Sequence, residues 1–189
     1  MQWIQKLAAS THSATHSAQT SSSSRSSLTI HWILPNQLAI GRLPRSGESQ
    51  ILSEAGIDHV LSLCAQAEGV LPLDVSQTFR CQRFILPDSD YLLRLNTRHL
   101  DRAVQILNQC FEARHTVYVH CLAGVERSPT LCVAYLCLHH DFELWEAVTW
   151  VKQVHPPAML TDDQIQVIRD LIQHRQNAQL RLSNDDLLC

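Results

Sequence analysis

Residues 120–130 read HCLAGVERSPT and follow directly on an apolar run, Val-Tyr-Val. Cys121 and Arg127 are joined by a short loop of mostly small residues that includes Gly124. The Ser128-Pro pair that follows is typical of the first turn of a helix. A strand, a loop and a helix start in this order predict a cradle for an anion with a nucleophile at its base.

The loop contains what a reactive thiolate needs. A free thiol is mostly protonated at neutral pH, whereas backbone N–H groups, a helix N-terminus and a guanidinium all favour the ionised form. Cys121 has all three within its own loop, and the planar fork of Arg127 matches two oxygens of a phosphoryl group. Gly124 gives the backbone the freedom to turn amides inward. The amides expected to bind the anion belong to Leu122, Ala123, Gly124, Val125, Glu126 and Arg127.

Two further side chains flank the nucleophile. We expect Ser128 to donate its hydroxyl to the sulfur, which would steady the sulfur as attacking and then leaving group. His120 directly precedes the cysteine and ends the apolar strand. We interpret it as a buried hydrogen-bonding residue that fixes the loop rather than as a proton shuttle.

Apolar patterns elsewhere alternate between strand and helix spacing. Strands are predicted at residues 29–34, 37–40, 57–63, 79–86 and 117–120. Helices are predicted at 49–55, 97–111 and 128–138, from 144 to the Pro156-Pro157 pair, and after a capping box of Thr161 and Gln164. This order predicts a single α/β domain with a central, mostly parallel sheet flanked by helices. Ligands gather at the carboxyl ends of the strands in such sheets, which is where the loop lies.

Composition divides the chain into three parts. Residues 1–27 are rich in Ser and Thr and contain no acid, which predicts a disordered extension. A cleaved organelle-targeting segment shares this composition and remains the alternative. Residues 28–177 are long enough and apolar enough to form one folded domain. Residues 178–189 are weakly patterned and predict a flexible C-terminal tail.

The formal net charge of -3 argues against a nucleic-acid groove or a basic membrane patch. No apolar run reaches the ~18 residues of a membrane span. The 7 cysteines are scattered without CxxC spacing, which predicts reduced thiols, a cytoplasmic location and no zinc site. We expect no metal, no cofactor and a monomer. Apart from the nucleophile, packing roles are expected for Cys64, Cys81, Cys110, Cys132 and Cys137.

The form HCxAGxxRSPT resembles the CX5R phosphate-binding loop of cysteine-dependent protein phosphatases, in their dual-specificity branch. Residues 34–41 (LPNQLAIG) and 55–63 (AGIDHVLSL) are similar to the opening turn and second strand of that family. The resemblance implies a general acid on an upstream loop, and the segment ILPDSDYLL offers two aspartates. We prefer Asp88, which directly follows a proline, and Asp90 is the alternative.

The reaction implied by the resemblance has two steps and needs no metal. Cys121 attacks phosphorus while Asp88 protonates the leaving oxygen, and water then hydrolyses the phosphocysteine intermediate. The implied substrate is a protein phosphorylated on Ser, Thr or Tyr, because the chain is short for the elements that give classical tyrosine phosphatases a deep pocket. The implied class is a dual-specificity protein phosphatase of the protein-tyrosine-phosphatase superfamily.

Other functions stay open on the sequence. If neither aspartate reaches the leaving group, the protein is a phosphate-binding pseudophosphatase. Phosphoglucan and phosphoinositide are alternative substrates; Glu126 and the absence of lysine between Cys121 and Arg127 place phosphoinositides and RNA triphosphates below phosphoproteins. A rhodanese-type sulfurtransferase ranks last, since the Arg-Ser-Pro ending of the loop favours phosphate chemistry.

Overall fold

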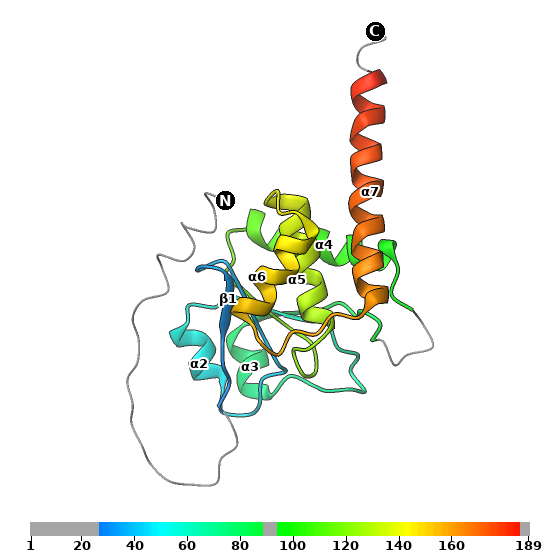
Figure 1. Ribbon diagram of the computed structural model, residues 1–189. Helices are drawn as coiled ribbons and strands as arrows, with labels where there is room; N and C mark the ends of the chain where they lie inside the picture. The colour runs from blue at the N-terminus through cyan, green and yellow to red at the C-terminus, as the bar shows by residue number, and fades with distance from the viewer. Residues whose placement is uncertain (1–26, 89–93, 186–189) are drawn as a thin grey trace.

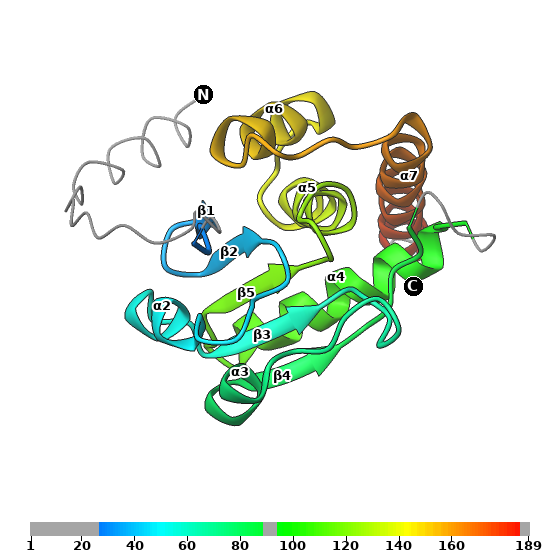
Figure 2. The same cartoon turned by 90° about the horizontal axis from the view of Figure 1, so that it is seen from below.

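The computed structural model describes residues 27–88 and 94–185. Within them lies a five-stranded sheet in the order β1-β2-β5-β3-β4, seen edge to edge in Figure 2. β1 is antiparallel to β2, and every other neighbouring pair is parallel. The predicted mostly parallel sheet is therefore confirmed. The strands are β1 (His31–Leu34), β2 (Leu38–Gly41), β3 (His59–Ser62), β4 (Arg80–Arg83) and β5 (Val117–His120).

Helices cover both faces of the sheet (Figures 1 and 2). They are α2 (Ser49–Glu54), α3 (Leu73–Thr78), α4 (Thr97–Glu112), α5 (Arg127–His139), α6 (Leu144–Val154) and α7 (Asp162–Asp185). Alternate strand residues point to opposite faces, so Val119 packs with the core under α4 to α7. Its neighbour Tyr118 packs with the smaller core under α2 and α3.

Several helix predictions are confirmed in type but not in extent. α5 is buried on all sides over Arg127–Leu136, as its almost unbroken apolar sequence predicts. It begins one residue before the predicted start at 128. α3 was not predicted, because its six residues LDVSQT show no helical repeat of apolar side chains. The predicted strands at 57–63 and 79–86 are shorter in the structure.

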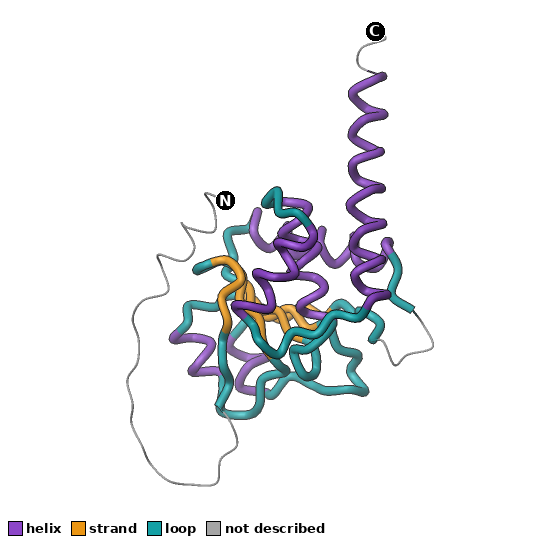
Figure 3. The backbone as a smooth tube through the Cα atoms, in the orientation of Figure 1, coloured by secondary structure: helices purple, strands orange, loops and turns teal. Residues whose placement is uncertain are grey.

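The sequence predicts a flexible tail from residue 178, but in the structure α7 continues as a helix to Asp185. Figures 1 and 3 show this end of α7 projecting away from the body of the domain. The packing role expected for Cys81 is also wrong, since its side chain is exposed. β4 lies at the edge of the sheet, and its first two residues, Arg80 and Cys81, are exposed to solvent.

The predictions for residues 1–26 and for Asp90 lie outside the described residues. Within residues 27–88 and 94–185, no helix is both long enough and apolar enough to cross a bilayer. The same ranges contain no group of three or more His, Cys, Asp or Glu side chains that could hold a metal ion.

Candidate active site

Three strands end together where residues 121–127 begin; we call this segment the CX5R loop. His120, the last residue of β5, is paired with Gly41 of β2 on one side and with Ser62 of β3 on the other. Cys121 therefore emerges from the carboxyl edge of the sheet at its centre. α5 begins at Arg127, so the buried N-terminus of this helix closes the loop.

The Cys121 thiol is buried, with 3% of its surface exposed. The hydroxyl oxygen of Ser128 lies 3.4 Å from its sulfur, a position from which the hydroxyl can donate. His120 is fully buried and its Nδ1 lies 3.0 Å from the carbonyl oxygen of Cys121. Burial lowers the pKa of His120 to about 4, so the ring is neutral at physiological pH and Nδ1–H donates to the carbonyl.

Donors from outside the loop hold its carbonyl oxygens on the outer side. In a trans peptide the N–H points opposite to the C=O, and the described chain has no cis bond. Each carbonyl held from outside therefore turns the next amide inward, toward the anion cradle. The three contacts are Leu43 N to Leu122 O at 3.1 Å, His155 Nε2 to Gly124 O at 2.7 Å and Met159 N to Val125 O at 2.7 Å.

Gly124 meets two requirements at the centre of the loop. Its φ of +76° lies in the left-handed region that residues with a side chain rarely adopt. A Cβ atom at this position would also lie 2.7 Å from the carbonyl oxygen of Gly41. Gly124 thus adopts a backbone conformation that needs a glycine, as the sequence predicts. The absence of a side chain also lets the loop pack against the end of β2.

Arg127 is held by two carboxylates. Its two terminal amines donate to the two oxygens of Glu68 at 3.0 and 2.7 Å. One of those amines also lies 2.7 Å from Asp88. Burial works to lower the Arg127 pKa, but the hydrogen bonds to Glu68 and the charges of Cys121 and Asp88 outweigh it and raise the pKa. The guanidinium is therefore permanently charged.

The third nitrogen of this guanidinium remains available. Among the described residues Arg127 Nε has no hydrogen-bond partner, although it is buried. A buried donor without an acceptor carries a desolvation cost. A phosphoryl oxygen at the loop would supply the missing acceptor, and this fits the anion expected from the sequence.

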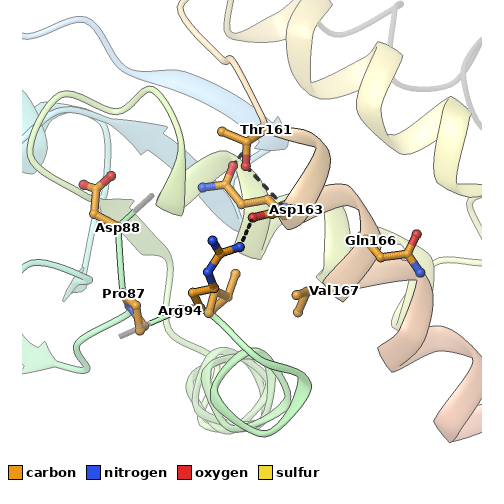
Figure 4. Close-up of a pocket in the computed structure, with 9 residues that line it drawn as sticks. Pro87, Asp88, Arg94, Thr161, Asp163, Gln166 and Val167 are labelled. Carbon is orange, nitrogen blue, oxygen red and sulfur yellow. Dashed lines mark hydrogen bonds and ion pairs between the residues drawn. The ribbon is translucent and has the colours of Figure 1, made fainter. Parts of the chain in front are cut away.

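Asp88 follows β4 and Pro87, and the structure brings it to the loop through its contact with Arg127. It also lines a cavity of about 280 Å³ that extends toward the start of α7. Figure 4 shows this cavity, which is also lined by Arg94 and Asp163; these two exposed side chains form an ion pair of 2.9 Å. The Asp88 side chain thus contacts Arg127 of the CX5R loop and also lines this cavity.

The side chain of Glu126 points toward α7. Its carboxylate accepts a hydrogen bond of 3.2 Å from the side-chain amide of Gln164. Gln164 and Thr161 form the predicted capping box, since each accepts from the backbone of the other. The Glu126 charge nevertheless stays within the loop segment, beside the proposed anion site.

Sequence reasoning missed Glu68 and His155. Glu68 stands 59 positions before Arg127 and meets it only because β3 and β5 are neighbours. Its position just beyond the end of a predicted central strand was the available signal. His155 precedes Pro156-Pro157, where the sequence indicated only the end of a helix.

A model of the dual specificity phosphatase catalytic domain matches residues 40–177. The chain is 30% identical over 143 residues to Protein-tyrosine-phosphatase IBR5 of Arabidopsis thaliana, covering 75% of this chain and 50% of that relative. It is 26% identical over 133 residues to Phosphatidylglycerophosphate phosphatase PTPMT2 of the same plant, covering 70% of this chain and 58% of the relative. The chain thus spans about half the length of these curated relatives.

Solved structures show the same fold. The crystal structure of PTPMT1 in complex with PI(5)P superposes with a TM-score of 0.68 at 19% identity. The superposition covers 79% of this chain and 97% of that one. The similarity therefore extends over nearly the whole of that domain.

Proposed function

Because this chain belongs to the dual-specificity phosphatase family, we propose that it hydrolyses phosphomonoesters through a phosphocysteine intermediate. The family membership confirms the resemblance seen in residues 120–130. One observation carries the proposal: the Cys121 sulfur, the Ser128 hydroxyl, Arg127 and Asp88 meet at the carboxyl end of β5.

In the first step the Cys121 thiolate attacks phosphorus in line with the leaving oxygen. The bond from phosphorus to that oxygen breaks, and the protonated carboxyl of Asp88 gives its proton to the departing oxygen, which leaves as a hydroxyl group. In the second step water attacks the phosphocysteine, Asp88 takes the proton from the water, and the thiolate leaves. Inorganic phosphate is released, and Cys121 and Asp88 return to their starting forms.

The loop amides and Arg127 stabilise the equatorial oxygens in both steps. The outward carbonyls support this role, since they direct the amides of the loop toward the anion. Arg127 Nε, which has no partner among the described residues, supplies a further donor. The contact of Asp88 with Arg127 supports turnover over a purely phosphate-binding function, because it brings the acid within reach of the reacting group.

We propose phosphorylated Ser, Thr and Tyr residues of proteins as the substrates. The loop offers one phosphate-facing cation, Arg127, and carries the carboxylate of Glu126 close by. Glu68 adds a second carboxylate against the same guanidinium. These negative carboxylates would repel a second, negatively charged phosphate group. The arrangement therefore favours substrates with one phosphate over headgroups with several.

A phospholipid monoester is the second candidate. The similarity to a plant phosphatidylglycerophosphate phosphatase favours it. A phosphoglucan, which is a phosphorylated carbohydrate, is a further alternative. These substrates and phosphoproteins differ in the leaving group rather than in the phosphorus chemistry.

Phosphate release should be measured on a panel of phosphopeptides, phosphoinositides, phosphatidylglycerophosphate and phosphoglucan at equal concentrations. We expect the highest kcat/KM for phosphopeptides and no turnover by Cys121→Ser. Greater activity on the lipid or the glucan would contradict the proposed substrate but leave the chemistry intact. Sulfur transfer from thiosulfate without phosphate release would contradict the chemistry itself.

A further inference from the structure

His155 connects the CX5R loop to β1. Its side chain is almost entirely buried, with 3% exposed, and its Nε2 lies 2.7 Å from the carbonyl oxygen of Gly124. On the other side of the ring, Nδ1 lies 2.5 Å from Nδ1 of His31, the first residue of β1. The two rings meet edge to face. A chain of two imidazoles thus runs from β1 to the centre of the loop.

The partners of each nitrogen fix where the protons are. A carbonyl oxygen only accepts, so Nε2 of His155 must carry the hydrogen. In the neutral ring Nδ1 of His155 is then an acceptor, and Nδ1 of His31 must donate to it. Burial lowers the pKa of both histidines, which supports the neutral form for each ring. His31 therefore selects the tautomer in which His155 donates to the loop.

The Gly124 carbonyl and the Val125 amide belong to the same peptide unit. Holding the oxygen outward directs the Val125 N–H toward the anion cradle. Glycine with φ of +76° imposes little steric resistance to rotation of this unit. If the peptide turned over, its carbonyl oxygen would face the anion and repel it.

The residues that follow His155 hold the next peptide as well. Met159 N donates to the carbonyl oxygen of Val125 at 2.7 Å, which orients the amide of Glu126 in the same way. The segment is itself closed by a bond from Ala158 N to the carbonyl oxygen of His155. Residues 155–159 therefore hold two consecutive peptides of the CX5R loop, one through a side chain and one through the backbone.

We propose that His155, in the tautomer selected by His31, is a positioning residue that keeps the Val125 amide aimed at the bound oxyanion. This role rests on the proposed function in so far as the oxyanion is the phosphoryl group of the substrate. His155 does not touch the reacting atoms; it acts through the Gly124–Val125 peptide.

The test compares tungstate affinity, measured by calorimetry at neutral pH, in the wild type and in His155→Leu and His155→Gln. Leucine fills the space without a donor, whereas the glutamine amide places an N–H near the position of Nε2. We expect tungstate to bind about tenfold more weakly to His155→Leu and within about twofold of the wild type to His155→Gln. His174→Leu, an exposed histidine on α7, is the matched control and should bind as the wild type does.

His31→Phe tests the second half of the proposal. It keeps a ring against His155 but removes the donor to Nδ1. We expect tungstate affinity to fall by less than it does in His155→Leu. The KM for an aryl phosphate should rise by a similar factor. In the wild type, nitrogen-15 NMR should show His155 protonated at Nε2 and bare at Nδ1, a readout that does not depend on any variant folding.

Equal tungstate affinity in wild type and His155→Leu would overturn the proposal, as would a glutamine variant as weak as the leucine variant, or protonation of His155 at Nδ1. Failure of the positioning role can be distinguished from failure of the proposed function. If the wild type binds tungstate but hydrolyses no phosphomonoester, the function fails while the positioning role is still decided by the variants. If the wild type hydrolyses phosphomonoesters and the variants match it, only the positioning role fails.

Discussion

Glu68 and Arg127 form a two-pronged ion pair next to the CX5R loop, with both carboxylate oxygens on the two terminal amines at 2.7 and 3.0 Å. Arg127 is 2% exposed and Glu68 12%, so the pair is largely shielded from water. The fork-to-fork geometry fixes the plane of the guanidinium. Glu68 therefore decides how Arg127 presents its remaining donor to a phosphate.

Glu68→Ala should destabilise the protein and slow the reaction. It removes the main partner of a buried cation, and the loss of one member of such a pair is costly. Because Asp88 still contacts Arg127, we expect the free energy of unfolding to fall by about 2 kcal/mol rather than by the full cost of a broken buried pair. Urea denaturation and kcat/KM on an aryl phosphate measure the two effects.

Gln66→Ala is the matched control, since Gln66 is exposed on the same loop and should change neither quantity. If Glu68→Ala left kcat/KM unchanged while lowering stability, Glu68 would be a structural residue without influence on the reaction.

Asp88→Asn should separate binding from catalysis. Its carboxylate competes with phosphate for an amine of Arg127 at 2.7 Å, so removal of the charge should tighten tungstate binding by about threefold. The same change should lower kcat about 100-fold for a poor leaving group and much less for a good one. Asp170→Asn, an exposed carboxylate on α7, serves as the control.

This prediction also discriminates between the two aspartates named from the sequence. If Asp90→Asn shows the dependence on the leaving group and Asp88→Asn does not, then Asp90 is the acid and the contact with Arg127 has another purpose.

Gly124→Ala and Gly56→Ala form a pair that separates backbone strain from crowding. Both glycines have positive φ, +76° and +72°, but only at Gly124 would the new Cβ meet another atom, the Gly41 oxygen at 2.7 Å. Gly56→Ala should cost about 1 kcal/mol of stability and leave activity intact. Gly124→Ala should cost more and abolish tungstate binding. Equal effects of the two variants on tungstate affinity would show that the close approach to β2 is unimportant.

His120 should make stability fall in mild acid. Burial holds its pKa at about 4, below the value near 6.5 in the unfolded chain. Between those values the unfolded state binds more protons, so the free energy of unfolding drops as pH falls below 6.5. From neutral pH to pH ~5 this one residue accounts for about 2 kcal/mol.

The measurement compares urea denaturation of the wild type and His120→Asn at both pH values. Asparagine keeps a donor near the position of Nδ1 but does not titrate, so the difference between the two proteins should shrink in acid. The other histidines with lowered pKa cancel in this comparison. A difference independent of pH would mean that folding leaves the pKa of His120 unchanged, contrary to the effect of burial.

The parts of this site that follow from the sequence are the local ones. Cys121, Gly124 and Arg127 lie within seven consecutive residues, and their chemistry can be read without knowing what packs around them. The residues that orient them are distant in sequence. Glu68 is 59 positions from its partner, and His31 is 124 positions from His155. Periodicity within either segment does not predict such a contact, because it arises only when distant elements pack together.

The fold shows the same division. The amphipathic repeat of α4 and the apolar run of α5 predicted those helices, because each buries a continuous surface. Residues 173–181 of α7 are exposed, so apolar spacing gave no signal for this part of the helix. Just before residue 178, a side-chain hydrogen bond from Gln173 to Asn177 runs along the helix. A helix without an apolar stripe therefore cannot be predicted from hydrophobic periodicity.

The most direct test of the account is to trap the phosphoenzyme. Asp88→Asn should be mixed with an aryl phosphate that has a good leaving group, because the first step then proceeds while the loss of the base slows hydrolysis. After rapid quenching, peptide mass spectrometry should find one phosphoryl group on Cys121 and none in the matched Cys121→Ser, Asp88→Asn protein. Phosphate release without a phosphorylated Cys121, or a phosphoryl group on another residue, would contradict the mechanism.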